Sequence, residues 1–172
     1  MADTLTIEAL ARLTWTRKEA LDLSNVVDSA TLEWKESLAD GTGADQTDLV
    51  WHDERSILTT ANDDLDMTAL VATIFGSTVT TNFVKVKLIL IINRSTTAGE
   101  ELKLDSSVAN GFLGPFNGSA TSKIEIGPDS ALLLSSKKDG WTVTAATGDI
   151  IRINNPNATT VTYRVVIAGT SA

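Results

Sequence analysis

Hydrophobic and polar residues alternate along much of this chain, which is the pattern of β-strands with one buried face. The last stretch, residues 160–167, shows it most clearly, because Val161, Tyr163, Val165 and Ile167 share one phase. Residues 83–92 alternate at first and are then apolar at every position. This second pattern predicts a central strand that is buried on both faces.

Shorter strands are expected over residues 100–104, 122–126, 130–134, 141–144 and 149–153. Turn-forming pairs such as Asn117-Gly118 and Asp139-Gly140 separate them. Many short strands with frequent turns predict an all-β fold, a β-sandwich of jelly-roll type. The expected core residues share the buried phases of these strands: Val86, Leu88, Leu90, Leu132, Ile151, Tyr163 and Val165.

Two extended stretches, residues 4–18 and 30–38, precede this rhythm, with the turn-prone residues 22–25 between them. Leu13 and Trp15 share a phase in the first stretch, as Leu32 and Trp34 do in the second, although residues 8–12 also fit one helical turn. A Gly-Thr-Gly linker follows. The sequence therefore predicts an N-terminal extended β segment over residues 1–46 and a sandwich body over residues 47–172.

Two roles fit the N-terminal segment. Its strands are rich in Leu, Ile and Trp and need burial, while the body has enough strands to close a sandwich. We therefore expect an assembly arm that pairs with a neighbouring subunit or with a capsid. The alternative is that Leu32 and Trp34 lie on an edge strand of the same domain.

The first part of the body is less regular. Residues 47–60 predict a strand with a bulge or turn at the polar cluster His52-Asp53-Glu54-Arg55. Asp63, Asp64 and Asp66 are expected in a turn. Residues 68–75 predict an irregular connection, with room for one turn of helix.

The composition limits the classes of binding partner and of chemistry that are expected for this chain. The 172 residues suit one domain, and threonine, valine and isoleucine favour strands. The net charge of −8 opposes attraction to nucleic acids and to anionic membranes, so neither is an expected partner. Cysteine is absent, which excludes disulfides and thiolate chemistry. The N-terminus lacks a basic leader followed by an apolar block, so we expect synthesis in a cytoplasm.

Candidate catalytic groups are few. His52 is the single histidine and has no partner in the sequence pattern that would converge on a metal or a substrate. The acids at 63, 64 and 66 lack the spacing and closing Glu of a calcium loop. Nucleophile-elbow, phosphate-loop and dinucleotide motifs are absent from the sequence. We therefore expect a protein that is not an enzyme and that uses no cofactor and no metal.

Four tryptophans offer interaction surfaces instead. Trp34 and Trp51 are in phase with aliphatic neighbours and are expected in the core. Trp141 follows a turn and is the best candidate for an exposed aromatic platform. The candidate interaction residues are Trp15, Trp34 and Trp141.

Residues 47–172 resemble a family of small virion proteins of tailed bacteriophages. The resemblance lies in the segments DLVWHDER (48–55), DLD (64–66), FVKVK (83–87) and GWTVT (140–144), and in the ending from Val161-Thr162-Tyr163 to Gly169-Thr170-Ser171-Ala172. It implies a structural protein of the virion. The favoured role is a capsid decoration or cement protein that stabilises the phage head. A tail or fibre subunit is the first alternative, and a carbohydrate-binding sandwich that uses Trp141 is the second.

The resemblance also implies the partners. These are the major capsid protein or other virion proteins, together with further copies of the chain, with a homotrimer favoured. It carries no catalytic residues.

Overall fold

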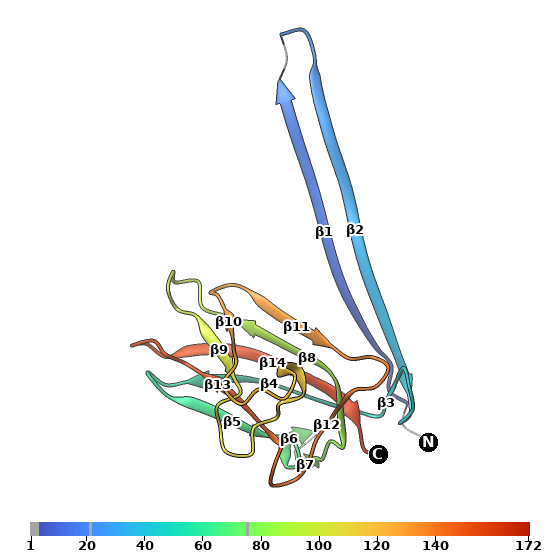
Figure 1. The fold of residues 1–172 in the computed structure, drawn as a ribbon, viewed down its shortest axis with the longest axis vertical. Helices are drawn as coiled ribbons and strands as arrows, with labels where there is room; N and C mark the ends of the chain where they lie inside the picture. The colour runs from blue at the N-terminus through green and yellow to red at the C-terminus, as the bar shows by residue number, and fades with distance from the viewer. Residues whose placement is uncertain (1–3, 21, 75) are drawn as a thin grey trace.

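A long two-stranded hairpin projects from a β-sandwich in the computed structural model, which describes residues 4–20, 22–74 and 76–172 (Figure 1). The hairpin consists of β1 (Ile7–Ala20) and β2 (Asn25–Asp40), and residues 7–20 pair in antiparallel register with residues 25–38. The turn lies where the sequence predicted it. At its base, β2 pairs in parallel with the short strand β3 (Gln46–Thr47), which leads into the body.

The body contains two main sheets. The first has the order β11-β8-β14-β4, with β12 added beside β8. Its strands are β4 (Leu49–Ile57), β8 (Lys85–Asn93), β11 (Ala131–Ser135), β12 (Trp141–Thr142) and β14 (Val161–Thr170). The second has the order β10-β9-β13-β5, and its strands are β5 (Asn62–Asp66), β9 (Leu102–Asp105), β10 (Lys123–Ile126) and β13 (Ile150–Asn154).

Two smaller elements complete the body. Strands β6 (Leu70–Ile74) and β7 (Ser77–Thr81) form a separate hairpin, and η1 (Gly114–Phe116) is one turn of 3₁₀ helix. The fold is an all-β sandwich, as the sequence predicted. In the described part of the chain, no helix has the length and apolar character needed to span a membrane.

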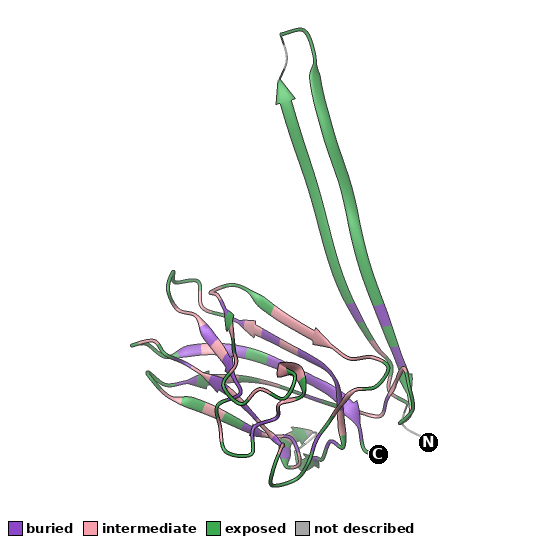
Figure 2. Ribbon diagram, viewed as in Figure 1, coloured by how far each residue is buried: buried purple, intermediate pink, exposed green. Residues whose placement is uncertain are grey.

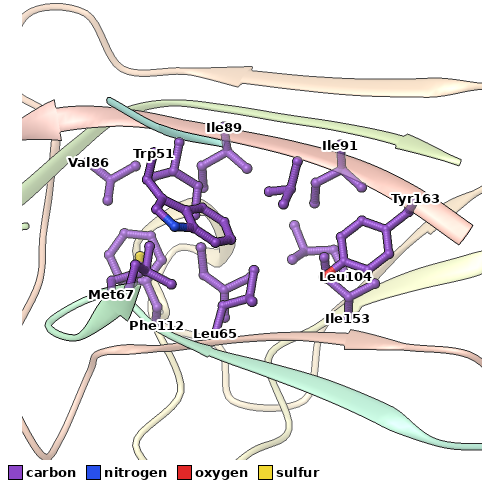
Figure 3. Packing of buried hydrophobic residues seen from close by; sticks show 14 of the residues in the cluster. Trp51, Leu65, Met67, Val86, Ile89, Ile91, Leu104, Phe112, Ile153 and Tyr163 are labelled. Carbon is purple, nitrogen blue, oxygen red and sulfur yellow. The ribbon is translucent and has the colours of Figure 1, made fainter. Parts of the chain in front are cut away.

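The hydrophobic core fills the space between the two main sheets (Figure 3). Trp51, Ile89 and Tyr163 project into it from the first sheet, and Leu65 and Ile153 from the second. The predicted phase of the last strand is confirmed, since its residues 161, 163, 165 and 167 are all buried. Of the other predicted core residues, Val86, Leu88 and Ile151 are buried, whereas Leu90 and Leu132 are only partly buried.

A bulge explains why β8 changes its pattern halfway. The pairing of β8 with β14 shifts between Ala168 and Gly169, so that Lys87 is left without a partner in the register. Val86 and Ile89 therefore both point into the core, while Leu88 points to the outer face. The Lys87 side chain is buried, and its ammonium donates to the carbonyls of Lys137 and Lys138.

The structure corrects three local predictions. Within the stretch 68–75, residues 70–74 do not make an irregular connection with a helical turn, because they form β6 and pair with β7, and residue 75 lies outside the described residues. Strand β4 runs through the polar cluster at 52–55 without a break, since every residue from Leu49 to Ile57 pairs with β14. The acids at 63, 64 and 66 lie on strand β5 rather than in a turn.

Candidate functional site: the apolar face of the hairpin

Cross-strand pairing sorts the hairpin side chains onto two faces. Because side chains alternate along a strand, odd-numbered residues of β1 share a face with even-numbered residues of β2. This register aligns three successive pairs: Ala11 with Trp34, Leu13 with Leu32, and Trp15 with Ala30. We call these six residues the hairpin face.

The hairpin face is apolar and lies open to solvent. The exposed fractions are 63% for Leu13, 66% for Leu32, 41% for Trp15 and 44% for Trp34. Figure 2 shows that the projecting part of the hairpin is exposed along its length, whereas buried residues appear only near its base. Contiguous exposed apolar side chains of this size usually mark an interaction site.

The opposite face of the same hairpin is largely polar. Lys35 pairs with Glu8 at 2.8 Å, and Arg12 lies 4.0 Å from Glu33. The hydroxyls of Thr14 and Thr31 are 3.1 Å apart. The hydrogen bond and charge of Glu8 raise the pKa of Lys35. This face is therefore suited to contact with water. The two faces of the hairpin differ as the solvent-facing and core-facing sides of an ordinary strand differ.

The base of the hairpin is fixed to the outer face of the first sheet. Ala9 packs with Leu88 and Ala168 in a small second cluster, and Ile7 and the partly buried Leu90 lie against it. Strand β8 is thus covered on both sides, as its sequence predicted, by the core on one side and by the hairpin base on the other. The carboxylate of Glu36 accepts a hydrogen bond from Ser135 at 2.5 Å.

A charged contact supports the same joint. Asp45, in the loop that follows β2, accepts a hydrogen bond from Lys138, and its carboxylate lies 3.5 Å from Lys137. The contact with Lys138 lowers the pKa of Asp45. The backbone N–H of Asp45 also donates to the carbonyl of Lys137. The hairpin therefore projects from a joint that is both apolar and charged.

The tryptophans separate into three environments. The structure brings Trp15 and Trp34 together on the hairpin face, but it corrects the prediction that Trp34 lies in the core. Trp51 is in the core, as predicted, with 2% exposure, and its indole N–H donates to the carbonyl of Val71. Trp141 lies in the body on β12, is partly buried and packs against the core.

The sequence did not nominate the four other residues of the hairpin face, Ala11, Leu13, Ala30 and Leu32. Each shares a phase with a nominated tryptophan, so the alternation was visible in the sequence. The missing information was the register across the turn, which places both leucines in one pair between the two indoles.

The remaining chemical candidates have structural partners. Asp63 receives two hydrogen bonds from Arg55, at 2.6 and 3.0 Å, and a third from the Tyr163 hydroxyl at 2.8 Å. Asp64 pairs with Arg152 at 2.7 Å. These contacts raise the pKa values of Arg55 and Arg152, and burial together with the charge of Asp63 raises that of Tyr163.

His52 is exposed and lines a shallow groove of about 560 Å³ between β4 and the β6–β7 hairpin. The groove is also lined by Trp51, Val71, Thr73 and Thr81. Within the described residues, no three His, Asp or Glu side chains gather closely enough to hold a metal ion.

Comparisons with known proteins add little to this geometry. No protein-family model and no curated protein matches the chain. Among solved structures, the chain is similar to the Yersinia pseudotuberculosis-derived mitogen at 14% identity and a TM-score of 0.34. That similarity covers 72% of this chain and 88% of the mitogen.

Proposed function

We propose that the chain is a non-enzymatic structural subunit of a tailed-bacteriophage virion, with a capsid decoration or cement protein as the preferred role. The observation that carries the proposal is the hairpin face, an open apolar surface held away from a well-packed body. A surface of this kind suits a protein that works by attachment to other proteins.

The energetics of the hairpin support an assembly role. A two-stranded ribbon without further strands is marginally stable in water. The hairpin carries apolar side chains on the face that would be covered if another protein packed there, and its other face is largely polar, with Leu10 and Val27 as exceptions. Its residues therefore favour a bound state over a free one, as expected for an assembly arm spanning residues 1–46.

The sandwich suits the same role. We infer a jelly-roll topology, and the chain path supports it, because the chain crosses between the two main sheets six times. These crossings join β4 to β5, β5 to β8, β8 to β9, β10 to β11, β12 to β13 and β13 to β14. Jelly rolls are frequent in capsid proteins.

A tail or fibre subunit is the second candidate, because a projecting hairpin also suits an elongated assembly. The carbohydrate-binding alternative has less support. Its proposed platform was Trp141, whose side chain packs against the core rather than standing free.

Labelling of intact phage particles that encode this chain tests the proposal. An antibody against the chain, carrying a gold label, should bind many copies on the head surface. Label confined to the tail would assign the chain to the tail or fibre instead. Absence of the chain from purified virions would overturn a virion role altogether.

A further inference from the structure

We infer that the partner of the hairpin face is the same face of a second copy of this chain. This inference names the partner of the surface on which the proposed function rests. It concerns the purified protein, however, whereas the virion role concerns the phage particle, so each can fail without the other.

The first argument is the order of side-chain sizes on the hairpin face. In the first cross-strand pair a small side chain, Ala11, lies opposite a large one, Trp34. The middle pair joins two leucines, Leu13 and Leu32, and in the third pair the large Trp15 lies opposite the small Ala30. This order is unchanged by a half-turn about an axis through the Leu13–Leu32 pair, perpendicular to the sheet. A two-fold interface requires a patch that complements itself, and this one has the symmetry to do so.

The second argument is the fit of indole against alanine. If two copies pack with their hairpins parallel, Trp34 of one meets Ala11 of the other, and Trp15 meets Ala30. If the hairpins are antiparallel, Trp15 meets Ala11, and Trp34 meets Ala30. In both cases each large side chain faces a small one and leucine faces leucine, which is how packed sheets interdigitate.

The surface has a hollow at the required place. A depression of about 210 Å³ is lined by Ala11, Arg12, Leu13, Leu32 and Trp34. An indole of the second copy lies over Ala11 in either packing direction. The hollow is therefore the receiving site for that ring.

The charges leave this contact undisturbed. All six residues of the hairpin face are uncharged, and the ion pairs Glu8–Lys35 and Arg12–Glu33 lie on the opposite face. On the same side, the charged residues lie beyond the six, including Arg17 and Asp28 toward the tip and Glu36 toward the base. A chain with a net charge of −8 opposes its own association in general. An uncharged stripe is the part of such a surface on which two copies can approach at the lowest electrostatic cost.

Light scattering coupled to size-exclusion chromatography measures the association. The full chain should have a mass that is an even multiple of 18.3 kDa, and Leu13→Glu should reduce it to a single chain because a carboxylate is then buried in an apolar contact. Thr14→Glu is the matched control, since it places the same charge one residue away on the polar face, and it should keep the oligomer.

The outcomes are unambiguous because circular dichroism reports folding of the body in each variant. A monomeric full chain would overturn the inference, and so would an oligomer that survives Leu13→Glu. Loss of the oligomer in Thr14→Glu to the same extent would also overturn it, because the effect would then not belong to the hairpin face.

Thiol cross-linking provides a direct second test, since the native chain has no cysteine. Leu13→Cys and Leu32→Cys proteins are treated with a short thiol cross-linker, alone and mixed. Cross-links within each single variant support antiparallel hairpins, and cross-links only in the mixture support parallel ones. If neither condition gives more cross-linked product than Thr14→Cys, the inference is wrong.

Discussion

Asp63 joins three strands through its hydrogen bonds. Its carboxylate on β5 accepts from Arg55 on β4 and from Tyr163 on β14, so it links the two main sheets. The Tyr163 side chain is buried, and burial makes an unpaired hydroxyl costly. The contact therefore stabilises the packing of one sheet on the other.

Asp63→Ala should lower the free energy of unfolding by about 2–4 kcal/mol, because it leaves the buried Tyr163 hydroxyl without its acceptor and leaves Arg55 only its contact with Asp53. Asp64→Ala is the control on the same strand. Asp64 pairs with Arg152 at the surface, so its loss should cost about 1 kcal/mol or less. Urea unfolding measures both values, and equal losses would contradict this role for Asp63.

The carboxyl of Asp105 should make stability depend on acidic pH. Burial raises its pKa, but hydrogen bonds from Lys123 and Ser107 outweigh burial and hold the pKa below 3.8. A carboxyl whose pKa is lowered by folding contributes stability above its unfolded pKa, and this contribution is lost as the pH falls through the folded value.

The free energy of unfolding should therefore decline below about pH 4, and it should decline less steeply in Asp105→Asn. Urea unfolding at a series of pH values between about 2 and 6 compares the two slopes. Parallel slopes would show that another group is responsible for the acid sensitivity.

At the scale of the element, strand β14 allows little change at Gly169. It lies between β4 and β8, and a Cβ added at Gly169 would fall 2.0 Å from the carbonyl oxygen of Lys85 and 2.9 Å from the ring of Phe83. The bulge beside Gly169 brings the neighbouring backbone this close. Glycine is required here for space.

Gly169→Ala should lower the free energy of unfolding by about 1–3 kcal/mol, because the β14–β8 pairing has to shift. At Gly148 the nearest atom to an added Cβ is 3.8 Å away, so Gly148→Ala should change stability by only about 0.5 kcal/mol. Thermal unfolding of both variants makes the comparison. A larger loss for Gly148→Ala would contradict the steric explanation.

Strand positions were predictable because burial of one face leaves a period of two in the sequence. The phase of β14 and both strands of the hairpin follow from that period. The pairing of β6 with β7 did not follow from it, because most of the described residues of these two strands are exposed and the apolar run in β6 resembles a buried connection. The polar run in β4 misled for a similar reason, since it lies on an edge strand whose outer side chains face water.

The site was predictable only in part. Trp15 and Trp34 were nominated from their residue type, but Trp34 was assigned to the core because alternation looks the same on a core strand and on a projecting strand. Local sequence records which side chains share a face. It does not record whether another part of the same chain or another molecule covers that face.

At the scale of the whole molecule, the main core contains no hairpin residue. A chain of residues 47–172 should therefore remain folded and unfold cooperatively, while losing association with other copies. Circular dichroism and light scattering test the two parts separately. If the shortened chain unfolds, the hairpin contributes to the stability of the body, and the division at residue 46 is wrong.

The joint at the hairpin base also determines how far the molecule can reach. Fourteen residues of β1 at about 3.4 Å each give a lever of about 45 Å. A tilt of about 10° at the base therefore moves the tip by about 8 Å. The packing of Ala9 on Leu88 and Ala168, together with the Glu36–Ser135 hydrogen bond, fixes the direction in which the hairpin projects from the body. A small rearrangement at these five side chains therefore changes the position at which the tip of the hairpin first contacts a partner.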